Sequence, residues 1–209
     1  MKKVIVTYLI FLLSNISVFA AGIVIECDGY FIRKASKDTI QAKIVVPVDS
    51  DKRIQFKKLQ WKVTIKDKFS FIDFEKEPEE LKEFGFTYNK RKYVYWAVPN
   101  PFEISGPKTN KIYNYIFLRL RKPGYCKIFS GYTYENGLPP AEGRQNEDLI
   151  LKANNKEWMV VRKSEFISDI KYYFSDCKEI IEKVNNKTYN EKDLEKIVLD
   201  YNNFMSSKK

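Results

Sequence analysis

Histidine is absent from all 209 residues of the chain. Its absence excludes Ser-His-Asp and Cys-His catalysis, histidine-ligated zinc and a histidine pH switch. The eight glycines form no Gly-x-Gly-x-x-Gly run and no phosphate-binding loop. Acidic residues are numerous, but no pair stands out by its spacing. The sequence therefore nominates no catalytic residue, no cofactor and no metal site, and it leaves a Ser-Lys or carboxylate mechanism open.

Cysteine is scarce, with Cys27, Cys126 and Cys177 as the three examples. At most one intramolecular disulfide can form, and no C-x-x-C pair suggests zinc or redox chemistry. Pairing of Cys27 with Cys126 is one candidate that the sequence does not determine. Cys177 falls on the apolar stripe of an expected helix, which favours a buried thiol.

Long apolar runs are absent except at the start, where Lys2 and Lys3 precede residues 4–13. This run is too short to cross a bilayer, and small Ala20 and Ala21 offer a cleavage point between them. We predict a signal peptide over residues 1–20 and a protein exported to the periplasm or the exterior. The mature chain then carries no transmembrane segment.

Acidic residues are fewer than basic ones, so the net charge is +10, or +8 once Lys2 and Lys3 are removed. An excess of this sign suits a polyanion such as an envelope glycan, an anionic lipid surface or nucleic acid. Nucleic acid fits least because the chain is expected to be exported. Lysines on the wet faces of strands explain the charge without any ligand, and this is the stronger interpretation.

Residues 21–163 show the alternation of β-strands. Apolar residues alternate over 40–48, and Leu59, Trp61, Val63 and Ile65 indicate one half-buried antiparallel strand. Aromatic runs at 84–88 and 93–98 flank Asn89-Lys90, which predicts a hairpin. The charged segment 75–81 is expected to be a solvated connection.

Pro99-Asn100-Pro101 marks a candidate boundary near 99–111 within this region. The nearly continuous apolar run 112–121 predicts a strand covered on both faces, and 125–134 its hairpin partner. Glu135 to Glu147 is expected to be a loop, equally compatible with a ligand site and with a plain insertion. A last hairpin is expected from 149–152 and 158–162, joined at Asn154-Asn155.

Residues 164–205 carry helical periodicity. Phe166, Ile170 and Phe174 are spaced by four after a Ser164 cap, and the stripe Cys177, Ile180, Ile181, Val184 follows a Ser175 cap with Asp176 in the first turn. Asn185 and Asn186 end that helix, and Asn190 caps the next, whose stripe is Leu194, Ile197, Val198 and Tyr201. We predict two or three short helices that cover the β region as a lid. The fold class is α+β, with antiparallel sheets as an open barrel or two layers and these helices at the C-terminus.

Three segments resemble an uncharacterised family of exported Bacteroidetes proteins. They are Asp28-Gly29-Tyr30-Phe31-Ile32 with Asp38 to Ile44, Pro78 to Phe86, and Phe174 to Asn202. The family pattern G-Y-I-V-T-x-x-G-D-T-I-x-G-K-I is altered here, with Ser36-Lys37 where glycine is usual and Ala42 in place of the second glycine. The resemblance covers most of the mature chain. It implies export and architecture, and it brings no established activity.

Aromatic and cationic side chains interleave on two expected strands, as in glycan and single-stranded nucleic-acid binders. The candidate binding surface is Arg91, Tyr93, Tyr95, Trp96, Tyr113, Tyr115 and Arg119. The same residues also suit a sheet core with cross-strand pairs. Asp38-Thr39-Ile40 resembles an O-glycosylation pattern at Thr39, although a turn into a strand explains it as well.

The function expected from these features is that of a non-enzymatic envelope protein that binds a partner protein or an anionic glycan. Two alternatives stay open. One is a carboxylate- or Ser-Lys-dependent hydrolase of an envelope polymer with its site near residues 135–147. The other is a periplasmic assembly factor.

Overall fold

The computed structural model describes residues 23–66, 73–102, 114–134 and 145–208. Ten antiparallel strands form one sheet in the order β10-β9-β8-β7-β6-β5-β1-β2-β3-β4. The expected signal peptide, Tyr113 and most of the 135–147 segment lie outside the described residues. The strands are β1 Val24–Arg33, β2 Thr39–Pro47, β3 Val63–Lys66, β4 Asp73–Lys76, β5 Leu81–Tyr88, β6 Arg91–Pro99, β7 Tyr115–Lys122, β8 Cys126–Tyr134, β9 Gln145–Ala153 and β10 Met159–Val161.

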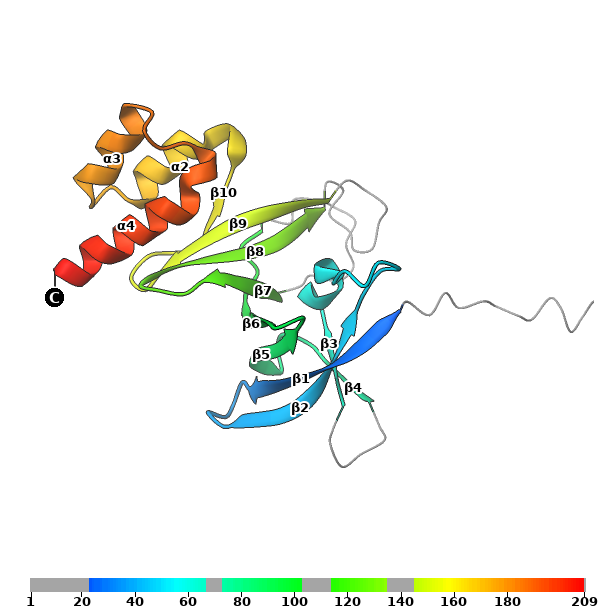
Figure 1. Cartoon of the computed structure of the whole chain (residues 1–209). Helices are drawn as coiled ribbons and strands as arrows, with labels where there is room; N and C mark the ends of the chain where they lie inside the picture. The colour runs from blue at the N-terminus through cyan, green and yellow to red at the C-terminus, as the bar shows by residue number, and fades with distance from the viewer. Residues whose placement is uncertain (1–22, 67–72, 103–113, 135–144, 209) are drawn as a thin grey trace, which may run out of the picture.

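Three helices follow the sheet: α2 Phe166–Tyr173, α3 Lys178–Asn185 and α4 Leu194–Ser207. They pack beside β8, β9 and β10 at one end of the molecule (Figure 1). The α+β class and the antiparallel sheet with C-terminal helices are confirmed. None of the helices in the described ranges has the length and apolar composition that a bilayer span requires.

Alternation predicts the strands correctly where one face is buried. In β2, the side chains of Ala42, Ile44 and Val46 are 0–3% exposed and lie in the core with Phe84 and Phe86. The β5–β6 hairpin is confirmed: Asn89 and Lys90 have φ angles of 49° and 62°, the pair of positive values that a type I′ turn needs. In β7, Ile116, Phe117 and Leu118 are all buried, as expected of a strand covered on both faces.

The predicted strand over 59–65 is wrong in its first half. Residues Phe56–Gln60 form a short 3₁₀ helix, η1, and only Val63–Lys66 is a strand. Leu59 is buried in the β1–β6 core, whereas Trp61 packs against the cluster on the other face of the sheet. A 3₁₀ turn can send these two side chains to separate cores, and the tertiary contacts override the alternation.

Three further boundaries differ from the sequence predictions. Glu75 and Lys76 belong to β4 rather than to a connection, and residues 145–147 begin β9 rather than ending a loop. Neither Ser164 nor Ser175 caps a helix, because α2 begins at Phe166 and α3 at Lys178. Asp176 instead accepts hydrogen bonds from Lys156 and Tyr201, so a tertiary contact takes the carboxylate that the sequence assigned to the helix.

The helices pack on one end of the sheet. Their apolar stripes share one core with Cys126, Ile128, Leu151 and Ala153 of the sheet. Asn190 caps the last helical segment in a complete capping box with Asp193, and Asn186 ends α3. The possible Cys27–Cys126 disulfide is not formed: all three cysteines are buried free thiols, and Cys27 lies in a different core cluster from the other two.

Candidate functional site

A cleft of about 730 Å³ lies over the β5–β6 hairpin and the C-terminal half of β7, and we call it the basic cleft. Cationic side chains dominate its lining: Lys52, Arg53, Arg91, Lys92, Arg119 and Arg121. Asp51 is the one carboxylate of the lining, and Glu147 bonds two of its arginines. The Lys92 ammonium group lies over the Tyr30 ring on the other face of the sheet. Five cations against two carboxylates then leave a net charge of +3, which favours an anionic ligand.

Strand register places Arg91, Arg119 and the aromatic rings on the same face. Tyr88 lies opposite Arg91, Phe86 opposite Tyr93, and Arg119 of β7 opposite Tyr95 of β6. Residues opposite one another in an antiparallel pair share a face, so this side of the sheet carries alternate rings and guanidinium groups. The I′ turn at Asn89-Lys90 fixes this register.

The turn between β2 and η1 forms another wall of the basic cleft. The Asp49 carboxylate accepts hydrogen bonds from the backbone N–H groups of Asp51 and Arg53, and Lys52 adopts a φ angle of 59°. The Tyr88 hydroxyl donates to the Lys52 carbonyl at 2.9 Å. This wall is therefore fixed to the β5–β6 hairpin.

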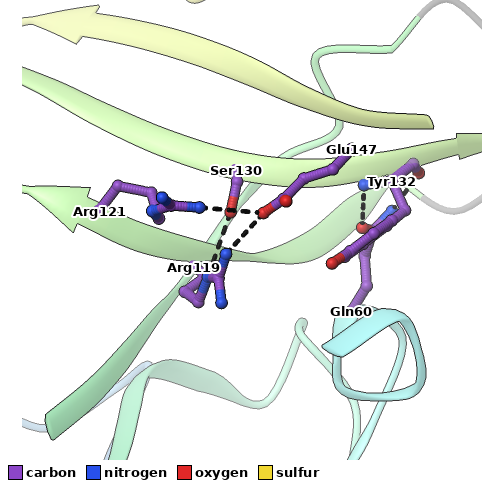
Figure 2. Close-up of polar contacts among 6 residues, drawn as sticks. All are labelled: Gln60, Arg119, Arg121, Ser130, Tyr132 and Glu147. Carbon is purple, nitrogen blue, oxygen red and sulfur yellow. Dashed lines mark hydrogen bonds and ion pairs between the residues drawn. The ribbon is translucent and has the colours of Figure 1, made fainter. Parts of the chain in front are cut away.

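Arg119 is the innermost cation of the basic cleft, with a side chain 11% exposed. Its guanidinium lies 3.9 Å from the ring centroid of Phe56. Its Nε donates to Ser130 Oγ at 3.2 Å (Figure 2). Nη2 donates to Glu147 Oε1 at 2.5 Å. Stacking, a neutral acceptor and one carboxylate together hold this cation in place.

Gln60 closes the same region by joining η1 to β8. Its Nε2 donates to the Tyr132 carbonyl at 2.9 Å, and its Oε1 accepts from the Tyr132 N–H at 2.6 Å (Figure 2). The β7–β8 pairing runs from Lys122 and Ile128 to Arg119 and Ser130. Beyond this pairing, Tyr132 of β8 has no partner among the described residues of β7, and the Gln60 amide bonds its backbone groups instead.

Asn202 of α4 does the same at the opposite end of β8. Its Oδ1 accepts from the Cys126 N–H at 2.7 Å, and its Nδ2 donates to the Cys126 carbonyl at 3.1 Å. Residues 126, 128, 130 and 132 are alternate residues of β8. The row of backbone hydrogen bonds between β7 and β8 is therefore continued by the Gln60 amide at Tyr132 and by the Asn202 amide at Cys126. They fix both ends of the strand that carries Ser130.

Tyr95 lies beneath this site with its side chain in the core. It is 2% exposed and stacks on Phe84 with ring centroids 4.6 Å apart. Within the described part of the chain its hydroxyl has no hydrogen-bond partner. Burial raises the pKa of the Tyr95 phenol, which stays protonated.

The structure separates the residues of the candidate surface. Arg91, Tyr93 and Arg119 line the basic cleft, and Tyr95 is on the same face but buried. Trp96 packs on the opposite face, and Tyr115 lies under Lys34, whose Nζ is 3.7 Å from its ring centroid. Thr39 is exposed at the start of β2, and its glycosylation stays a prediction.

Sequence reasoning missed the wall made by residues 51–54, Phe56, and the role of Glu147. The Asx-turn chemistry of Asp49 was a readable signal for the wall. No local signal could bring Phe56 or Glu147 to Arg119, because these contacts span sheet positions far apart in the chain.

A smaller hollow of about 290 Å³ adjoins Glu147, the last residue of the segment for which the sequence leaves a hydrolase site open, and three acids line it: Glu147, Asp148 and Glu191. Glu147 is paired with arginines, and Thr133 donates to Asp148 at 2.5 Å. Across the four described ranges, no cluster of three or more His, Cys, Asp or Glu side chains is suited to a metal ion.

Comparison with known protein families, with curated proteins and with solved structures finds no match to this chain.

Proposed function

We propose that the chain is an exported envelope protein that binds an anionic glycan in the basic cleft and catalyses no reaction on it. One observation carries the proposal: five cationic side chains, with Lys92 directed to the other face, and three aromatic rings, those of Phe56, Tyr88 and Tyr93, line a single hollow. Guanidinium groups bind carboxylate, sulfate or phosphate, and aromatic rings pack against the apolar faces of sugars. The combination suits an acidic saccharide better than a simple ion.

The volume of the cleft is sufficient for an oligosaccharide. A volume of about 730 Å³ falls within the range of roughly 300–1,000 Å³ usual for ligand sites. Its wall is built by the Asp49 turn and fixed by Tyr88, so the cations are already gathered before a ligand arrives. Pre-organised cations lose less conformational entropy on binding.

Export rests on the sequence alone. The lysines at positions 2 and 3, the apolar run and Ala20-Ala21 form a signal peptide, and the resemblance to exported Bacteroidetes proteins agrees with it. The protein then meets surface and envelope glycans rather than nucleic acid. Periplasmic or extracellular location is part of the proposal.

The test is a binding series with the mature chain from residue 21. Isothermal calorimetry against acidic and neutral oligosaccharides of equal length should give binding of the acidic ones alone, weakening as salt rises. Arg91→Gln should reduce that affinity by about two- to fivefold, as expected for one exposed ion pair. Arg33→Gln is the matched control, because Arg33 is an exposed arginine on β1 outside the basic cleft.

Equal affinity for neutral and acidic saccharides would refute the proposal, as would an Arg91 variant indistinguishable from the native chain. Hydrolytic turnover that a Ser, Asp or Glu substitution abolishes would favour the hydrolase alternative instead. Capture of an envelope protein from the native host by the mature chain, without any glycan binding, would favour an assembly factor.

A further inference from the structure

Glu147 adjoins the basic cleft and is the carboxylate paired with two of its arginines. Its Oε1 lies 2.5 Å from Nη2 of Arg119 and 3.2 Å from Nη1 of Arg121, so one oxygen bridges two guanidinium groups (Figure 2). The residue lies on β9 opposite Tyr132, two strands away from Arg119. Strand pairing, rather than a local turn, thus brings this anion to the arginines.

Exposure differs among the three partners. The Arg119 side chain is 11% exposed, whereas those of Arg121 and Glu147 are 37% and 36% exposed. A nearly buried guanidinium needs a counter-charge, because an unpaired charge in such a place is costly. The carboxylate that supplies it is open to solvent on its outer side, so an external anion can reach the same two arginines.

The bridge leaves guanidinium capacity unused. Each guanidinium presents a planar fork that suits both oxygens of a carboxylate. Glu147 gives a single oxygen to both forks, whereas a ligand carboxylate could offer two oxygens to Arg121 alone. Tyr93 and Arg91 line the same cleft, where they can contact the ring that carries such a carboxylate.

We infer that Glu147 is an internal counter-ion holding the place of a ligand carboxylate, and that the glycan bound in the basic cleft is a uronic-acid oligosaccharide. This inference rests on the proposed function. Binding exchanges one carboxylate for another at Arg121, while Arg119 stays stacked on Phe56. Glu147 then limits the affinity for the ligand carboxylate.

The experiment compares the native mature chain with Glu147→Gln, using tetragalacturonate as the carboxylated probe and maltotetraose as the neutral one. Glu147→Gln should bind tetragalacturonate about two- to fivefold more tightly, because a competing carboxylate of exposed-pair strength is removed. Its salt dependence should also steepen. Glu26→Gln makes the same charge change at an exposed pair with Lys66, outside the basic cleft, and should leave affinity unchanged.

A structural role for Glu147 predicts the opposite sign. If Glu147 only orients Arg119 and Arg121, Glu147→Gln binds tetragalacturonate more weakly than the native chain, and that result or an equal affinity overturns the inference. Thermal melting adds a second readout: tetragalacturonate should raise the melting temperature of Glu147→Gln more than that of the native chain. Should Glu147→Gln fail to fold, Glu147→Asp keeps the charge, withdraws the carboxylate by one methylene and should also bind more tightly.

Two further outcomes separate this inference from the proposed function. Binding of a sulfated oligosaccharide without tetragalacturonate overturns the carboxylate assignment and leaves an anionic-glycan protein. No binding of any acidic saccharide by either chain refutes the proposed function itself.

Discussion

Replacement of Gln60 by leucine removes the clamp between η1 and β8 without changing side-chain size by much. Gln60 is 1% exposed, and its amide bonds the N–H and the C=O of Tyr132 at 2.6 and 2.9 Å. Both backbone groups would lose their partner. Each unsatisfied buried group costs about 1–3 kcal/mol, and Tyr132 is only half-buried, so the loss of both bonds in Gln60→Leu should lower the free energy of unfolding by roughly 2–5 kcal/mol.

Urea denaturation followed by tryptophan fluorescence measures this loss, since Trp61 adjoins Gln60 in the chain. For a domain of this size 1 kcal/mol shifts the melting temperature by about 2–4 °C, so calorimetry should find a fall of roughly 4–20 °C. Gln41→Leu makes the same change at an exposed position of β2 and should stay within about 0.5 kcal/mol of the native chain.

A Gln60→Leu chain as stable as the native one would refute the reasoning. It would mean that water or a shifted strand satisfies Tyr132, and that η1 is held by the burial of Leu59 alone. Gln60→Glu distinguishes these cases, because it keeps the acceptor for the Tyr132 N–H but sets a carboxylate against the carbonyl.

Three other predictions concern the core and the lid. Tyr95→Phe removes a buried hydroxyl without a described partner and should be neutral or stabilising in urea denaturation. Tyr173→Phe breaks hydrogen bonds with the Ala153 N–H and the Glu157 carbonyl and should lower the free energy of unfolding by about 1–2 kcal/mol. Truncation after Lys163 uncovers Cys126, Ile128 and Leu151 and should unfold the chain or bind a hydrophobic dye, and a stable, dye-free β domain would contradict the lid. Hydrogen bonds from Tyr189 and Lys183 lower the pKa of Asp200. The contribution of this carboxylate to stability is therefore present above about pH 4 and is lost as the pH falls through the folded-state pKa. Asp200→Asn should make the free energy of unfolding depend less on pH in acid denaturation.

The sequence predicts the parts of the fold whose signals are local. Alternation in β2 and the Asn89-Lys90 turn depend on neighbouring residues, and the structure follows both. Caps are less secure. Asn190 caps through a reciprocal box with Asp193, whereas Ser175 and Asp176 lose their predicted role because Lys156 and Tyr201 bind Asp176. A helix start is predictable from its sequence when no distant side chain binds the polar side chains expected at that start.

Only part of the basic cleft is predictable from the sequence, because some of its contacts join residues far apart in the chain. Arg91 and Tyr93 lie on one strand, and the period of two places them on one face. Trp96 follows Tyr95 directly and must therefore point to the other face, so a surface containing both could not be a single site. Glu147 and Phe56 reach Arg119 only through the order of strands in the sheet, which the chain does not display locally.

Three polar side chains beside the basic cleft are buried or nearly buried. Gln60 is a buried amide, Arg119 is a nearly buried cation, and Tyr95 has a buried hydroxyl without a described partner. Packing alone would be better served by apolar side chains at all three positions, because each polar group loses its hydration on burial. They are concentrated where β6, β7, β8 and η1 meet, beside the basic cleft. Buried polar groups gathered beside a cleft are a pattern expected of a site kept for binding rather than for stability, and this pattern supports the basic cleft apart from the number of its cations.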